Sequence, residues 1–279
     1  MPPVGAAIAW RDAPEADAET LARVTRIVLD PAFRYPSLPE SATELLALAS
    51  HEEVPYREID AVIRREPLVA ARILAVANSA RFRLDIPAIS LRSAMMRLGW
   101  GTLREVLWQV LADSQVFHGP ERTKLTQLRA HCTWVAQCTR MLALHLAVDT
   151  EYAYAAGLLH DLGRPLTRRA LLECPELRAH AHRQDLVDAL HAPVGERVAQ
   201  AWNLPAVIVQ TVGSHHRLER PGTDPLVWVV AAAERFGDHH QIAGRSGPLD
   251  PEEPLFARLG LSPPEVLVLL AASARLGAV

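Results

Sequence analysis

Lysine is almost absent from this sequence, since Lys124 is the only one and arginine supplies nearly all of the positive charge. The 29 basic residues face 32 acidic ones, which leaves a formal net charge of -3. A chain without a strong positive field does not attract nucleic acid over its whole surface, so such binding would need a local basic patch. We therefore expect no nucleic-acid partner.

Cysteine is also scarce. The three cysteines, Cys132, Cys138 and Cys174, form no Cys-X-X-Cys pair. This number and spacing exclude a disulfide framework and favour a reducing compartment. No run approaches the roughly 18 apolar residues of a membrane span, and residues 1–10 lack the basic start of a signal peptide. We therefore expect a cytoplasmic protein without a membrane partner.

The alternation of apolar and polar residues that marks a half-buried strand is missing throughout. Apolar residues recur instead at helical spacing, as in Ile59, Val62 and Ile63. With 279 residues, 49% of them hydrophobic, the chain is long enough to bury a substantial core. These features predict an all-α protein.

Composition and periodicity divide the chain into three parts. Residues 1–20 lack periodicity and are expected to form a loose arm, residues 21–122 an N-terminal helical subdomain, and residues 123–279 a second helical subdomain. In the last part, helices are predicted at 126–147, 151–161, 184–190, 194–202, 205–214, 225–236 and 263–277. Proline and glycine mark the boundaries, and Pro193 separates two of these helices. The polar stretch 237–254 is predicted to be a loop, long enough to be mobile or functional.

Six residues of metal-ligand type lie on or at the ends of predicted helices. They are His131, His160, Asp161, His191, His215 and His216. The pair His160-Asp161 ends one predicted helix, and His191 precedes Pro193 at the expected start of another. A single His-Asp pair is a weak signal, but an ordered set on several helices of one bundle favours a shared site.

Imidazole and carboxylate groups are ordinary ligands of zinc, iron and manganese. An adjacent His-Asp pair at a helix end can turn both side chains into one cavity, where the carboxylate can bridge two ions. Two such ions activate water and clamp a phosphoryl group. The set therefore predicts a site for one or two divalent ions (Fe, Mn or Zn). His239 and His240, in the polar stretch, are predicted to be solvated surface residues.

Two motifs carry a family resemblance. The first half contains Glu66-Pro67-Leu68 followed by Ala77-Asn78-Ser79, and the second half contains the His160-Asp161 motif. On these residues the chain resembles, from about residue 25 to residue 235, the HDOD branch of the HD superfamily, which is related to the HD-GYP cyclic-dinucleotide phosphodiesterases. The resemblance implies a multi-helix HD-superfamily bundle with an N-terminal helical subdomain packed on it. Asn78 and Ser79 are expected to bond to nearby backbone rather than to a ligand.

The resemblance also implies roles at the site. The six residues match ligand positions of HD-GYP-type sites, and Arg164 stands where a lysine is common. The aspartate that closes such a site corresponds to Ala232, and the Gly-Tyr-Pro loop is absent after His216. Glu234 and Asp238 lie nearby, but a residue two positions further along a helix points about 200° away. The sequence therefore predicts a partly retained metal site that lacks one anionic ligand.

Three functions follow from these features. The first is a bacterial signal-transduction module that acts through protein or ligand binding, with little or no catalysis. The alternative is an active metal-dependent phosphohydrolase or phosphodiesterase acting on cyclic dinucleotides or another phosphoester, with His160, Asp161 and Arg164 as catalytic candidates. The third is a scaffold in which the six residues are only buried polar groups. The expected partners are signalling proteins, a small phosphorylated ligand, or a second copy in a homodimer.

Overall fold

The computed structural model describes most of the chain outside its N-terminal segment. The described residues are 22, 25, 26, 40–51, 54–63, 67–82, 84–117, 121–148, 150–173, 183–219 and 222–277. They form helices joined by turns and contain no strand, so the all-α prediction is confirmed. Among these helices, none combines the length and the apolar character needed to cross a membrane. The predicted arm at 1–20, and Cys174, lie outside the described residues.

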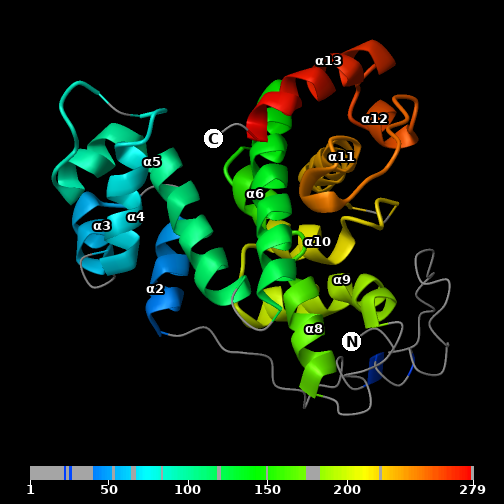
Figure 1. Ribbon diagram of the computed structural model, residues 1–279, viewed down its shortest axis with the longest axis horizontal. Helices are drawn as coiled ribbons and strands as arrows, with labels where there is room; N and C mark the ends of the chain where they lie inside the picture. Colours follow the sequence, from blue (N-terminus) through cyan, green and yellow to red (C-terminus); the bar gives the residue numbers. More distant parts are fainter. Residues whose placement is uncertain are drawn as a thin grey trace.

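The N-terminal helices form a group of their own, and α6 runs between them and the C-terminal helices (Figure 1). The first group consists of α2 (Glu40–Ala49), α3 (Tyr56–Ile63), α4 (Pro67–Ala77) and α5 (Leu91–Leu111), which continues into a π-helical turn (Ala112–Val116). The remaining helices are α6 (Arg122–His145), α7 (Ala153–Leu159), α8 (Gly163–Glu173), α9 (Arg183–Ala201), α10 (Ala206–Ser214), α11 (Pro225–His239), α12 (Pro254–Arg258) and α13 (Pro263–Ser273).

Two apolar clusters hold these helices together. The larger cluster joins residues of α2–α5 to residues of α6–α10, and includes Leu107, Leu158 and Val194. The smaller one packs α6 and α7 against α11–α13 around Phe236 and Phe256. Because the larger cluster crosses the predicted boundary at 122/123, the two parts share a core. Their division into subdomains stays a prediction.

Asn78 closes the long connection between α4 and α5. Its side-chain amide donates to the carbonyl oxygen of Ala88 at 2.9 Å, and its Oδ1 accepts from the Ala88 N–H at 2.8 Å. The Ser79 hydroxyl donates to the Val76 carbonyl oxygen at 2.7 Å. These bonds match the expected backbone-bonding role of the Ala-Asn-Ser segment.

Helix α9 corrects the predicted break at Pro193. The helix runs unbroken from Arg183 to Ala201, so His191 lies inside it rather than at a helix start. A proline removes one backbone hydrogen bond within a helix. Here buried residues on both sides of it, among them Leu190 and Val194, form a continuous face in the larger cluster. Tertiary packing of this face offsets the local loss.

Helix α8 was missing from the predicted helices. It begins at Gly163, and Pro165 falls in its first turn, where proline is tolerated. Gly163 and Pro165, which predict a helix boundary, therefore lie in the first turn of α8. α8 packs directly on α9 and places Arg164 beside the His160-Asp161 turn.

Candidate metal centre

The structure brings the six residues of metal-ligand type together from four places in the chain. His131 comes from the middle of α6, the His160-Asp161 pair from the turn after α7, and His191 from α9. His215 and His216 follow the end of α10. Five of the six are buried, and only His216 is exposed. They divide into two sets that share Asp161.

The first set consists of Asp161, His191, His215 and His216, whose ligand atoms all lie within 4.8 Å of one another. The Nε2 atom of His191 is 3.3 Å from that of His215 and 3.1 Å from that of His216. Two nitrogens bound to one tetrahedral ion at about 2.0–2.1 Å lie about 3.3–3.4 Å apart. The spacing of these imidazoles is therefore that of ligands to a common ion.

Backbone carbonyl groups set the orientation of these rings. His191 Nδ1 lies 2.7 Å from the Asp188 carbonyl oxygen, and His215 Nδ1 lies 3.1 Å from that of Thr211. A carbonyl oxygen only accepts, so Nδ1 carries the proton and Nε2 presents its lone pair to the centre. Two lone pairs facing each other at such distances repel, and a cation between them removes that repulsion.

The carboxylate of Asp161 completes the first set. Its Oδ1 atom lies 3.4 Å from His191 Nε2 and 3.8 Å from His215 Nε2. This oxygen is buried and has no hydrogen-bond partner among the described residues. A buried polar atom without a partner costs free energy, and a bound ion would satisfy it. The donor set thus fits a divalent cation.

The second set consists of His131, His160, Asp161 and Glu234. The Nε2 atom of His160 is 3.5 Å from Asp161 Oδ2 and 3.5 Å from Glu234 Oε1. His160 Nδ1 lies 2.7 Å from the Gly157 carbonyl oxygen. All four residues are buried, so this set lies deeper than the first.

Glu234 corrects the assignment of Ala232 as the site-facing position of α11. Ala232 packs in the smaller apolar cluster, whereas Glu234 points at His160. Asp238 follows one turn later and contacts the same region through Arg245. The face of α11 that meets the site therefore carries Glu234. The site therefore has a second carboxylate.

Two arginines contact the buried aspartate. Arg164 Nε lies 2.7 Å from Asp161 Oδ2, and Arg164 also pairs with Asp188 on α9. Arg245 was not predicted as a site residue, and its NH1 lies 3.2 Å from the same Asp161 oxygen. The only sequence signal for it was the unusual length of the polar stretch 237–254.

His240 also differs from its predicted surface role. It is half-buried, and its Nε2 lies 3.0 Å from the Ser273 hydroxyl oxygen of α13. His239 is exposed, as expected.

Buried charges shift the pKa values of the acidic groups. Burial alone would raise the pKa of Asp161, but Arg164 and His160 outweigh it and hold that pKa well below 3.8. Burial also opposes ionisation of Glu234, yet His160 and His216 bring its pKa well below 4.5. For His160, burial is outweighed by Asp161 and Glu234, which raise its pKa to about 10. In the metal-free protein His160 is therefore a cation between two carboxylates.

The other buried histidines are neutral. Burial, together with Arg245, lowers the pKa of His131 to about 3. Burial, together with His216, lowers the pKa of His215 to about 3. Burial and Arg164 place the pKa of His191 well below 6.5. Neutral imidazole is the form that binds metal ions.

These shifts predict a pH profile for the metal-free protein. Below about pH 6.5 the unfolded chain protonates at His131, His191 and His215 while the folded protein does not, so stability falls as the pH drops. Each of these histidines changes the free energy of unfolding by roughly 1 kcal/mol per pH unit. His160 has the opposite pH dependence. Its stabilising contribution is fully present below about pH 6.5 and is lost as the pH rises to about 10.

We expect the free energy of unfolding to be highest near neutral pH and to fall more steeply on the acid side. Urea unfolding with a chelator at several pH values measures it. The same profile is expected for His239→Ala, because His239 is exposed. Greater stability at pH 5 than at pH 6.5 would contradict the assignment.

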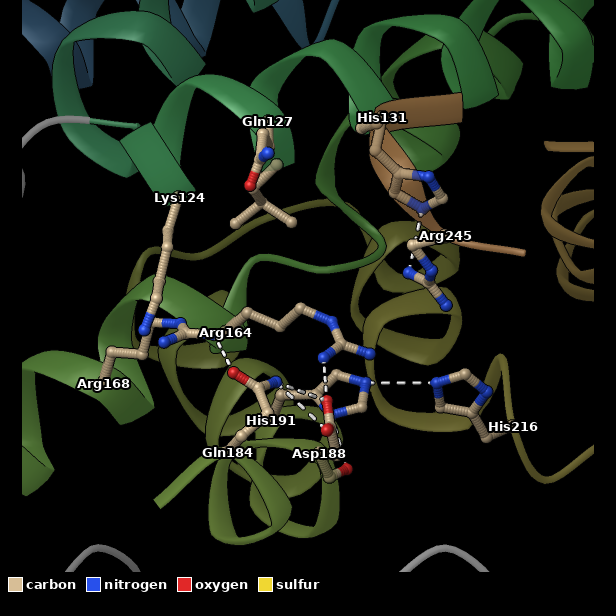
Figure 2. Close-up of a pocket in the computed structure, with 12 residues that line it drawn as sticks. Lys124, Gln127, His131, Arg164, Arg168, Gln184, Asp188, His191, His216 and Arg245 are labelled. Atoms are coloured by element: carbon tan, nitrogen blue, oxygen red, sulfur yellow. Dashed lines mark hydrogen bonds and ion pairs between the residues drawn. The ribbon is translucent and has the colours of Figure 1, made fainter. Parts of the chain in front are cut away.

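A basic pocket of about 550 Å³ opens beside the two sets (Figure 2). His191 and His216 of the first set line it, together with His131 of the second set and Arg164. Its other basic residues are Lys124, Arg168 and Arg245. Of the described residues that line it, only Leu128 and Ala243 are apolar. The pocket suits an anionic, polar ligand.

The family model of the HDOD domain matches residues 35–218, more than half of the chain. The chain belongs to the HDOD family. A Treponema pallidum relative of this HDOD protein, named only as uncharacterized, is 28% identical over 216 residues, which cover 71% of the chain and 41% of that relative. Ribonuclease Y of Latilactobacillus sakei is 26% identical over 184 residues, which cover 65% of the chain and 31% of that enzyme. The HDOD protein thus spans less than half the length of either relative.

Solved structures share the fold of this HDOD protein. An HDOD domain protein of unknown function from Geobacter sulfurreducens superposes with a TM-score of 0.71 at 22% identity, covering 94% of this chain and 97% of that one. A candidate metal-dependent phosphohydrolase from Shewanella amazonensis gives a TM-score of 0.66 at 19% identity, covering 91% and 98%. At these identities the likeness shows the fold alone.

Proposed function

We propose that this HDOD protein is a metal-dependent phosphohydrolase whose divalent ion is held by Asp161, His191, His215 and His216. The observation that carries the proposal is the first set: three imidazole Nε2 atoms and an unpartnered carboxylate oxygen converge beneath a basic pocket. The expectation of little or no catalysis rested in part on a missing carboxylate. Glu234 places a second carboxylate in the centre, beside His160.

The residues of the chain have distinct parts in this proposal. Arg164 faces the pocket and touches Asp161, so it can hold a phosphoryl oxygen beside the centre while orienting the aspartate. Lys124 and Arg168 lie further along the pocket and share Glu121 as a partner. They would bind a more distant anionic part of the substrate. Zinc, iron or manganese would supply Lewis-acid polarisation of the phosphoryl group and activation of water.

Loss of one ligand tests the proposal. We expect His191→Ala to lower metal affinity and the rate of phosphoester hydrolysis by at least about 100-fold, since even residues behind the ligands contribute 10–100-fold. Elemental mass spectrometry on protein purified without a metal-binding tag gives the metal content. The hydrolysis panel contains a chromogenic phosphomonoester and phosphodiester, a cyclic dinucleotide and a short RNA, the last because Ribonuclease Y is among the relatives.

The matched control is His239→Ala, an exposed histidine outside the site, which should retain both properties. Thermal melts of all variants identify any that fail to fold. Protein that contains no ion after incubation with zinc, manganese and iron would exclude a metal-dependent activity. Equal activity of His191→Ala and the parent protein would show that the ligand assignment is wrong.

A second candidate is a signalling module that binds a phosphorylated ligand or a protein without turnover. One observation favours it: Arg164 and Arg245 both neutralise the Oδ2 atom of Asp161. A carboxylate engaged in this way is a poor bridge between two ions. Stoichiometric metal and phosphate binding, with no hydrolysis of any compound in the panel, would favour this candidate.

A further inference from the structure

We propose that the guanidinium group of Arg245 takes the place of a second metal ion, so that this centre binds a single divalent ion in the first set. The inference rests on the proposed metal binding and deepens it. The second set offers four ligand-type residues, which by number alone would suggest a two-ion centre. The contacts made by Arg245 point to a different arrangement.

The two oxygens of Asp161 have different surroundings. Oδ1 faces His191 and His215 and, within the described part of the chain, has no hydrogen-bond partner. Oδ2 faces the second set and already accepts from Arg245 at 3.2 Å, with the Arg164 Nε at 2.7 Å. One oxygen is thus free for a metal ion, and the other is engaged by protein cations. This division separates the two sets chemically.

Arg245 also engages the other ligand atoms of the second set. Its NH1 lies 3.1 Å from His131 Nε2, and its NH2 lies 3.5 Å from Glu234 Oε1. An arginine N–H can only donate, so the His131 nitrogen accepts with its lone pair. That lone pair cannot bind an ion at the same time. Three of the four residues in the second set are therefore occupied by one guanidinium group.

The position of Arg245 is held from a second side. Its Nε lies 3.2 Å from Asp238 Oδ1, one helical turn after Glu234 on α11. The backbone before it turns sharply, with left-handed conformations at Gln241, Ala243 and Gly244. Such conformations are unfavourable for residues other than glycine and persist where the surrounding structure holds them. The arginine therefore has a defined place in the fold.

Metal stoichiometry tests the inference. Full-length protein is loaded with Mn²⁺ or Zn²⁺, dialysed, and measured by elemental mass spectrometry. We expect one ion per chain for the parent protein and two for Arg245→Met, which removes the charge but keeps a long side chain. Arg245→Lys retains a cation and is expected to stay at one ion. Paramagnetic resonance of the Mn²⁺ form should show an isolated ion in the parent protein and a coupled pair in Arg245→Met.

A second pair of variants gives an answer even if Arg245→Met does not fold. His131→Ala, in the second set, should keep the single ion of the parent protein, whereas His216→Ala, in the first set, should weaken its binding by at least about 10-fold. Two ions in the parent protein, or one ion in a folded Arg245→Met variant, would overturn the inference and leave the proposed function standing. No ion in the parent protein would overturn the proposed function itself.

Discussion

Replacing Asp161 by alanine is expected to lower the free energy of unfolding of the metal-free protein by about 3–5 kcal/mol. Asp161 is fully buried and is the common partner of Arg164 and Arg245. Removing one member of a buried ion pair leaves the remaining charges less well compensated, which costs more than the pair itself contributes. Arg164, whose side chain is only 13% exposed, cannot recover the lost interaction by turning to water.

The matched control for this prediction is Asp188→Ala. Asp188 is the other carboxylate partner of Arg164, but its side chain is 31% exposed. Pairs that water reaches contribute about 0–1 kcal/mol, so the control should lose far less stability. Urea unfolding in the presence of a chelator measures both variants without a contribution from metal binding. Equal losses for the two variants would show that burial does not determine the strength of the Arg164 contacts.

Replacing Gly163 by alanine is expected to lower the free energy of unfolding by about 3 kcal/mol and to disturb the metal centre. A Cβ atom at this position would lie 1.8 Å from the carbonyl oxygen of His191 and 2.8 Å from the backbone nitrogen of Gly195. Both are backbone atoms, so no side-chain rotation can relieve the overlap. Helix α8 would have to move away from α9, and His191 would move relative to Asp161.

Gly101→Ala is the control for this substitution. Gly101 lies within α5, and a Cβ added there meets no atom of the described residues within 4 Å. Alanine is favoured over glycine inside a helix by about 0.5–1 kcal/mol, so this variant should be slightly more stable than the parent protein. Denaturant unfolding and metal content are measured for both variants. A Gly163→Ala protein with unchanged stability and full metal content would contradict the close packing of α8 on α9.

The sequence predicted the helical class, and it pointed to candidate ligands, because both rest on local information. Helical spacing of apolar residues indicates buried faces wherever it occurs, as at Ile59 and Ile63, which are buried in α3. Histidine and aspartate stand out on otherwise apolar helices, as His131 does on α6. The family motifs then ordered these residues into one site. All six were correctly expected to meet, although their role as ligands stays a proposal.

The prediction for α11 failed because periodicity shows which residues share a helix face and not which face meets the site. The run from Val229 to Ala233 is buried throughout, so it contains no polar position to reveal the orientation of the helix. From the sequence, the orientation of Glu234 therefore follows only from its position two residues after Ala232. Only the packing of α11 against α6 and α7 decides that Glu234 faces His160.

The sequence by itself determined that this protein is all-helical and that it belongs among HDOD proteins, and it predicted that the six ligand-type residues meet. Tertiary structure alone decided that α9 continues through Pro193, that Glu234 supplies a carboxylate, and that Arg245 reaches the centre. Arg245 lies 84 residues beyond Asp161, in a stretch without helical periodicity. A contact of this kind depends on how the helices pack and where the intervening chain returns, because no local pattern links the two residues.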